Sequence, residues 1–295
     1  MQAAGKRYIA HGSRSNSFTV WNLSDIHLGN RACAVDTVKR DIERIRKDPT
    51  AFWLGGGDYA EYIGAQDKRF DPDAVAESLT VADMGKLGLV LTSRVRDLFK
   101  PIAHKCLGLL MGNHERHYER WTEQTGLHAW LCNELQVPNL QYSAFFDVVF
   151  CRCPGVKAPR LQFTYPPNHC GQGKSSYRFM VHHGAGFATT PAGKLKRLID
   201  FMERFDADVV MCGHVHDQKG QRLVRIGADK DCTTITAKES IGVISGSYLR
   251  TYAQGVTTYG EQKGYAPVPL GASFVRITPM AREVKDGERE ITGEV

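Results

Sequence analysis

Short apolar runs along the chain end abruptly in polar turns, and amphipathic segments separate them. The runs are rich in β-branched and aromatic residues and are too short for helices, so each predicts a buried strand. These strands are expected at residues 18–23, 51–54, 106–111, 178–181 and 208–212. Apolar residues spaced three and four apart predict helices at residues 35–45, 73–84, 87–99, 121–135 and 194–205. The alternation of strand and helix predicts an α/β protein.

The second half of the chain is richer in strand-forming residues. Further strands are expected at residues 143–150, 222–226, 233–236, 242–244 and 274–277. Prolines and glycines predict loops at residues 154–174 and 248–269, and the charged residues 281–295 are expected to be partly frayed. Because no repeat or linker divides the chain, we expect one domain over residues 1–295. It would carry a helical insertion at about 59–100 and an irregular C-terminal region from about 248.

The composition is typical of a soluble globular protein, with 42% hydrophobic and 24% charged residues. No apolar run approaches the roughly 18 residues that span a bilayer, and the N-terminus lacks the apolar core of a signal peptide. We therefore expect a cytoplasmic protein without a membrane partner. The net charge of +6 mildly favours an anionic partner, such as a phosphate-bearing substrate.

Eight cysteines are dispersed along the chain, and several lie inside apolar runs, where we expect them reduced. One group is less ordinary, formed by Cys151, Cys153, His169 and Cys170. These residues are either a small structural zinc site or loop thiols. Because the usual Cys-x-x-Cys spacing is absent, the sequence favours loop thiols.

Gly112-Asn113-His114-Glu115 follows the third predicted strand directly. An amide, an imidazole and a carboxylate at the end of a core strand need polar partners, because burying them unpaired is costly. They either satisfy one another or face a ligand.

Four other predicted strands also end in residues that bind metals. The polar strand ends are Asp25 with His27, Asp58, Asn113 with His114, His182 with His183, and His214 with His216. The carboxyl ends of strands in an α/β sheet meet at one edge, so these side chains are expected to converge. Carboxylate, amide and imidazole ligands suit manganese, iron or zinc. They are too many for one ion, and two ions about 3.5–4 Å apart would use them all.

Taken together and in this order, the motifs resemble the calcineurin-like metallophosphoesterases, and the overall look is similar to phage and prophage members. The resemblance rests on Asp25-x-His27, Gly57-Asp58, Gly112-Asn113-His114-Glu115, a histidine before Gly184, and Gly213-His214-x-His216. It implies a four-layer α/β/β/α sandwich of two mixed sheets with a dinuclear site above them. The implied cofactor is two divalent ions, manganese first, with iron, zinc, nickel and magnesium as alternatives.

The resemblance also implies roles for individual residues. One ion would be held by Asp25, His27, Asp58 and His216. The second would share Asp58 and be held by Asn113, His214 and one of His182 and His183, with His183 favoured. His114 would be the catalytic imidazole near the leaving oxygen. One position departs from the family pattern: Glu61 stands where many members have aspartate, which puts any orienting role there in doubt.

The implied activity is metal-dependent hydrolysis of phosphate esters, with diesters favoured over monoesters and DNA as one substrate. The alternative function is a phosphodiesterase or phosphomonoesterase that acts on small-molecule nucleotides. A third possibility is a non-catalytic interaction scaffold. The loops around the site offer basic residues for phosphate, namely Arg69, Lys86, Arg94, Arg96, Lys157, Arg160, Lys174 and Arg250. The oligomeric state stays open, a dimer included.

Overall fold

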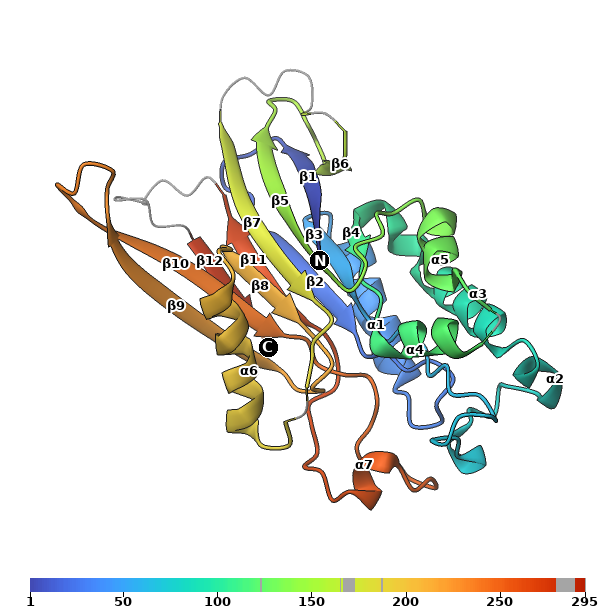
Figure 1. Ribbon diagram of the computed structural model, residues 1–295. Coiled ribbons are helices and arrows are strands. Elements are labelled where there is room, and N and C mark those ends of the chain that lie inside the picture. Colours follow the sequence, from blue (N-terminus) through green and yellow to red (C-terminus); the bar gives the residue numbers. More distant parts are fainter. Residues whose placement is uncertain (123, 165, 167–172, 187, 280–289, 295) are drawn as a thin grey trace.

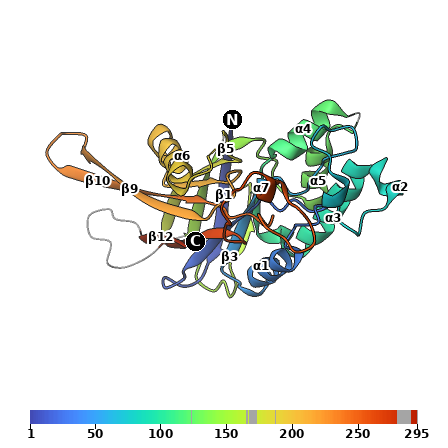
Figure 2. The same cartoon turned by 90° about the horizontal axis from the view of Figure 1, so that it is seen from below.

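Two β-sheets pack face to face, with helices on both outer faces (Figure 1). The computed structural model describes residues 1–122, 124–164, 166, 173–186, 188–279 and 290–294. Apolar side chains from both sheets, such as Phe52 and Phe179, fill the space between them. Helices on one outer side and a helix on the other complete four layers, as Figure 2 shows. The predicted four-layer α/β/β/α sandwich of two mixed sheets is confirmed.

The first sheet has five strands in the order β12-β11-β2-β3-β4. Its strands are β2 (Phe18–Ser24), β3 (Ala51–Gly57), β4 (Cys106–Leu109), β11 (Ser273–Thr278) and β12 (Glu290–Glu294). The strands β2, β3 and β4 run parallel, and β11 and β12 add an antiparallel edge. Every residue of β2, β3 and β4 is buried, which explains why they read as continuous apolar runs.

The second sheet has seven strands in the order β6-β1-β5-β7-β8-β10-β9. They are β1 (Gln2–His11), β5 (Ser143–Arg152), β6 (Arg160–Gln162), β7 (Lys174–His182), β8 (Val209–Cys212), β9 (Lys219–Ala228) and β10 (Ile235–Ile244). Strand β8 runs parallel to both β7 and β10. The carboxyl ends of β7 and β8 therefore point the same way.

Helices cover both sheets through amphipathic faces. The five-stranded sheet packs against α1 (Val35–Lys47), α3 (Leu87–Phe99) and α5 (Leu127–Leu135). The seven-stranded sheet packs against α6 (Pro191–Arg204) through Leu198 and Met202. The remaining helices are α2 (Val81–Met84), α4 (Asn113–Trp121), α7 (Tyr259–Gln262) and two 3-10 segments, Pro72–Ala74 and Lys100–Lys105.

Several expectations from the sequence differ from the structure. Glu290–Glu294, expected to be partly frayed, form β12, and the loops expected at residues 154–174 and 248–269 contain β6 and α7. Strand β1 was not expected. The helix expected at residues 73–84 is wrong, since only Val81–Met84 is α-helical. The helix expected at residues 121–135 is two helices, because α4 ends at Trp121 and Gly126, with φ of 76°, precedes α5. The short strands expected between residues 222 and 244 are parts of the long β9–β10 ribbon. Within the described residues, no helix is long and apolar enough to cross a membrane.

Candidate metal centre

The polar strand ends meet at the carboxyl edge of both sheets. Asp25 and Asp58 follow the neighbouring strands β2 and β3, and the Asp25 amide donates to the Gly57 carbonyl over 3.0 Å. Several of these residues have left-handed backbones that turn the chain sharply after the strand. Their φ values are 53° at Asp25, 52° at His27, 52° at Asp58, 71° at His214 and 46° at His216. This conformation is uncommon outside glycine, and Asp and His adopt it more readily than most residues.

Asp25, His27 and His216 form one group of converging ligand atoms, which lie within 4.8 Å of one another. The Nε2 atoms of His27 and His216 are 3.3 Å apart, and His216 Nε2 is 3.2 Å from Asp25 Oδ1. The other Asp25 oxygen, Oδ2, accepts hydrogen bonds from Ser24 Oγ and the His214 amide. Asp25 Oδ1 is buried and has no hydrogen-bond partner among the described residues. An orphaned carboxylate oxygen facing two imidazole nitrogens fits a cation.

Asp58, His183 and His214 form a second group, again within 4.8 Å. His183 Nε2 lies 3.3 Å from Asp58 Oδ2 and 2.9 Å from Asn113 Oδ1. Asp58 also belongs to a cluster with His27 and His114, so it stands between the two groups. It occupies the place a shared carboxylate would need.

The remaining ring nitrogen of three of these histidines is held by an oxygen. His27 Nδ1 lies 2.9 Å from Glu61 Oε2, and His183 Nδ1 lies 2.7 Å from the Gly56 carbonyl. His214 Nε2 lies 3.1 Å from the Gly186 carbonyl. Metal-binding histidines are held this way, which leaves the opposite nitrogen free for the ion. The residues present therefore fit divalent cations.

His182 lies away from this centre although it adjoins His183 in sequence. Successive residues at a strand end point to opposite faces, and His182 packs against Phe201 of α6 with ring centroids 4.8 Å apart. Its Nδ1 accepts a hydrogen bond from the Gly184 amide. Burial and the neighbouring imidazole of His183 lower its pKa to about 4. The structure brings His183, and not His182, to the other residues of the site.

Charges inside the site favour ionised carboxylates. Burial disfavours the charged form of Asp25, but the imidazoles of His216 and His183 outweigh it and lower its pKa to about 2. Burial is likewise outweighed at Asp58, whose pKa His183 and His114 hold well below its usual range. The same attraction raises the pKa of His183 to about 10 against the effect of burial. The centre thus holds two carboxylates that are ready to bind cations.

His114 lies in the first turn of α4, beside the metal-ligand groups. Its Nδ1 lies 2.6 Å from the Glu61 carbonyl oxygen, and its ring stands edge-on to His27 with centroids 4.7 Å apart. Burial opposes protonation, but the charges of Asp58 and Glu61 raise its pKa. The ring is thus suited to hold a proton at the nitrogen opposite the Glu61 carbonyl.

Two glutamates support the site, and the sequence alone did not assign either a definite contact. Glu61 orients His27 through its carboxylate and His114 through its carbonyl. Glu115 is buried and accepts hydrogen bonds from the amides of Asp58, Tyr59 and Gly112 over 3.0, 2.7 and 2.8 Å. Burial and the charge of Asp58 raise the pKa of Glu115 to about 7. Glu115 thereby ties the Asp58 turn to the start of α4.

The zinc alternative at Cys151, Cys153, His169 and Cys170 stays a prediction. Cys151 and Cys153 are buried at the end of β5 and just beyond it. His169 and Cys170 lie outside the described residues.

The two sheets and the paired carboxylate–histidine groups are the arrangement expected of a metal-dependent phosphoesterase. Residues 18–218 match the calcineurin-like phosphoesterase family, and the chain belongs to that family. The predicted resemblance is therefore confirmed, and the family's activity is phosphoester hydrolysis.

Solved structures similar to this chain share little sequence with it. Vps29 of Entamoeba histolytica in complex with Zn²⁺ is 12% identical with a TM-score of 0.36, over 94% of this chain and 97% of that one. A predicted phosphoesterase of Streptococcus pneumoniae TIGR4 is 11% identical with a TM-score of 0.33, over 95% and 99%. NAD nucleotidase of Haemophilus influenzae is 9% identical with a TM-score of 0.38, over 94% of this chain and 49% of that one. No curated protein matches the chain.

Proposed function

We propose that this protein is a phosphodiesterase that uses two divalent cations, manganese first, and accepts DNA among its substrates. One cation would be held by Asp25, His27, Asp58 and His216. The other would be held by Asp58, Asn113, His183 and His214. The observation that carries the proposal is the pair of ligand groups on either side of Asp58, with His114 beside them.

Charge balance supports a diester over a monoester. Two divalent cations against two carboxylates leave a charge of about +2. A protonated His114 adds about one positive charge beside the centre and the Glu61 carboxylate adds about one negative charge, so the two offset each other. An attacking hydroxide and a diester carry about one negative charge each, which neutralises the centre. A monoester dianion would add about one more negative charge to a buried site, where an uncompensated charge is costly.

Bound cations would supply two things here, a nucleophilic water at neutral pH and neutralisation of charge on the phosphoryl oxygens. The protein's own residues would position the metal-binding groups and supply a proton to the leaving oxygen. His114 would carry a proton on the nitrogen opposite the Glu61 carbonyl and donate it to the leaving oxygen, since its Nδ1 is engaged by that carbonyl. Glu115 would hold the Asp58 turn against the start of α4 through its three hydrogen bonds from backbone amides.

The proposal is tested with manganese-loaded protein and three substrates: bis(4-nitrophenyl) phosphate, 4-nitrophenyl phosphate and single-stranded DNA. We expect hydrolysis of the diester and of DNA, with the aryl diester preferred over the monoester. Asp58→Asn should remove activity and bound metal. Asp73→Asn, which changes an exposed carboxylate outside the site, serves as the matched control.

Each unfavourable outcome has a definite meaning. Preference for the monoester would favour the phosphomonoesterase alternative. Turnover of aryl diesters and nucleotide diesters without DNA cleavage would favour a small-molecule enzyme. Failure to bind metal together with failure to hydrolyse any ester would favour the non-catalytic scaffold.

A further inference from the structure

An arginine on the segment between β3 and α3 is anchored firmly by a carboxylate. Asp67 accepts three hydrogen bonds from Arg69: from its amide over 2.9 Å, from Nε over 3.1 Å and from Nη2 over 2.7 Å. Two parallel N–H···O contacts of this kind fix the plane of a guanidinium. Arg69 is therefore presented in one orientation although its side chain is 39% exposed.

The anchor is joined to the helix that carries His114. His117 Nε2 lies 3.5 Å from Asp67 Oδ2, and His117 follows His114 by one turn of α4. The same segment contacts α4 a second time, through the Glu61 carbonyl and His114 Nδ1. Asp67 raises the pKa of Arg69 most, and the charges of Glu61 and Asp58 raise it further. Arg69 is thus held on the His114 side of the site.

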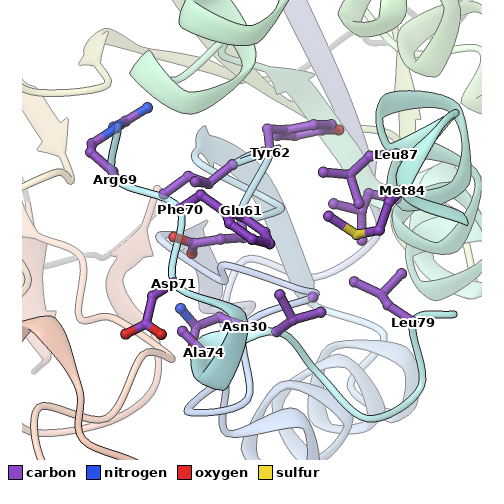
Figure 3. A pocket seen from close by; sticks show the side chains of 14 residues that line it. Asn30, Glu61, Tyr62, Arg69, Phe70, Asp71, Ala74, Leu79, Met84 and Leu87 are labelled. Carbon is purple, nitrogen blue, oxygen red and sulfur yellow. The ribbon is translucent and has the colours of Figure 1, made fainter. Parts of the chain in front are cut away.

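A small cavity adjoins this arginine. Figure 3 shows the charged ends of Glu61 and Arg69 on one side of it and the apolar Leu79, Met84 and Leu87 on the other. The cavity volume is about 30 Å³, which suits a water molecule and excludes a nucleobase. A ligand of Arg69 would therefore bind at the open guanidinium end, outside the cavity. Arg69 Nη1 makes no hydrogen bond within the described part of the chain.

Three other arginines that the sequence offered as phosphate contacts are bonded to protein groups. Arg94 donates to Ser78, Arg96 contacts Asp97 and Glu134, and Arg250 donates to the carbonyls of Ala32 and Cys33. Arg69 combines an anchored guanidinium, an unused nitrogen and a position beside the proposed proton donor. These properties suit recognition of an anion next to the leaving group.

We propose that Arg69 binds a second phosphate of the substrate, on the leaving-group side of the scissile diester. The protein would then select oligonucleotides over diesters that carry a single phosphate. This inference rests on the proposed phosphodiesterase function and on the role of His114 in it.

The test compares three thymidine dinucleotides: TpT, pTpT and TpTp. Each has one scissile diester, and the last two add a phosphate at one end or the other. With manganese-loaded protein, we expect kcat/KM to rise about tenfold for the isomer whose extra phosphate is on the departing nucleoside. Product analysis identifies that nucleoside. Most of the gain should appear in KM.

Arg69→Gln should abolish this preference, expressed for each variant as the ratio of kcat/KM for the phosphorylated dinucleotide to kcat/KM for TpT. Lys68→Gln is the matched control, because it removes an exposed charge at the adjacent position. Arg69→Lys, a gentler change, should retain part of the preference. An equal preference in wild type and Arg69→Gln would overturn the inference, as would a preference for phosphate on the retained nucleoside.

A binding measurement separates this inference from the proposed function. Calorimetric titration of the three dinucleotides into manganese-loaded His114→Ala measures affinity without relying on turnover. Tighter binding of one phosphorylated isomer, lost in the His114→Ala/Arg69→Gln double variant, would support the subsite even if wild type hydrolysed nothing. Equal affinity for all three dinucleotides would refute the Arg69 phosphate subsite even if the wild-type protein hydrolysed TpT.

Discussion

Glu61→Gln offers a sharp test of the proposed metal centre, because Glu61 contacts two site histidines by different atoms. Its carboxylate holds His27 at 2.9 Å, and its backbone carbonyl holds His114 at 2.6 Å. The substitution changes only the first contact and preserves the size of the side chain. It should therefore weaken the cation held by His27 and keep the backbone contact to His114, although it removes one of the two charges that raise the pKa of His114.

The expected size follows from the hydrogen bond that is weakened. A bond to a charged group contributes about 1.5–3 kcal/mol and a neutral one about 0.5–1.5 kcal/mol. The His27 side chain is 3% exposed and that of Glu61 18%, so little of the difference is lost to solvent screening. A loss of about 1.4 kcal/mol corresponds to an about tenfold larger dissociation constant for one cation.

Calorimetric titration of metal-free protein with manganese would resolve two binding steps. We expect one step to weaken about tenfold in Glu61→Gln and the other to stay within twofold. Glu77→Gln, on an 80%-exposed carboxylate of the same segment, should alter neither step. Equal weakening of both steps, or of neither, would refute the assignment of His27 to one cation only.

Three further predictions concern single histidines. His114→Ala should lower kcat about 10²–10⁴-fold and leave both cations bound, measured by elemental analysis, and loss of metal would show that His114 is a ligand. His183→Ala should lose one cation whereas His182→Ala should keep both, and the reverse pattern would contradict the observed geometry. His128 is buried, and burial lowers its pKa from 6.5 to about 4. The folded state keeps His128 neutral down to about pH 4, whereas the unfolded state takes up a proton near pH 6.5. The free energy of unfolding therefore decreases as the pH falls from 6.5 towards 4. By pH 5 the loss is about 2 kcal/mol. Urea unfolding measures the free energy of unfolding at pH 7.5 and 5.0. The difference between the two pH values should be smaller by that amount in His128→Leu than in wild type, and an equal difference would refute the lowered pKa of His128.

The strand ends could be predicted from the sequence because local pattern and global position agree there. The strands β2, β3 and β4 are buried along their whole length, so an unbroken apolar run stops where the site begins. Parallel pairing then brings successive strand ends together without further information. The choice of His183 over His182 needed the structure, because both follow the same strand and only the packing of His182 on Phe201 separates them.

Features that depend on distant contacts escaped prediction. Strand β1 mixes exposed and buried positions and is held by parallel pairing with β5, more than 130 residues away. Glu61 lies in a turn without regular structure, and its role follows only from its distance to His27. The break between α4 and α5 depends on Gly126, whose positive φ a helical periodicity does not reveal.

The left-handed backbones at Asp25, His27, Asp58, His214 and His216 have a consequence for how the protein could evolve. Each costs roughly 1–2 kcal/mol relative to a relaxed conformation. The five together approach the 5–15 kcal/mol by which whole domains are stable. A descendant released from selection for metal binding would gain stability by replacing these residues. The turns that bring these side chains together therefore lower the stability of the fold.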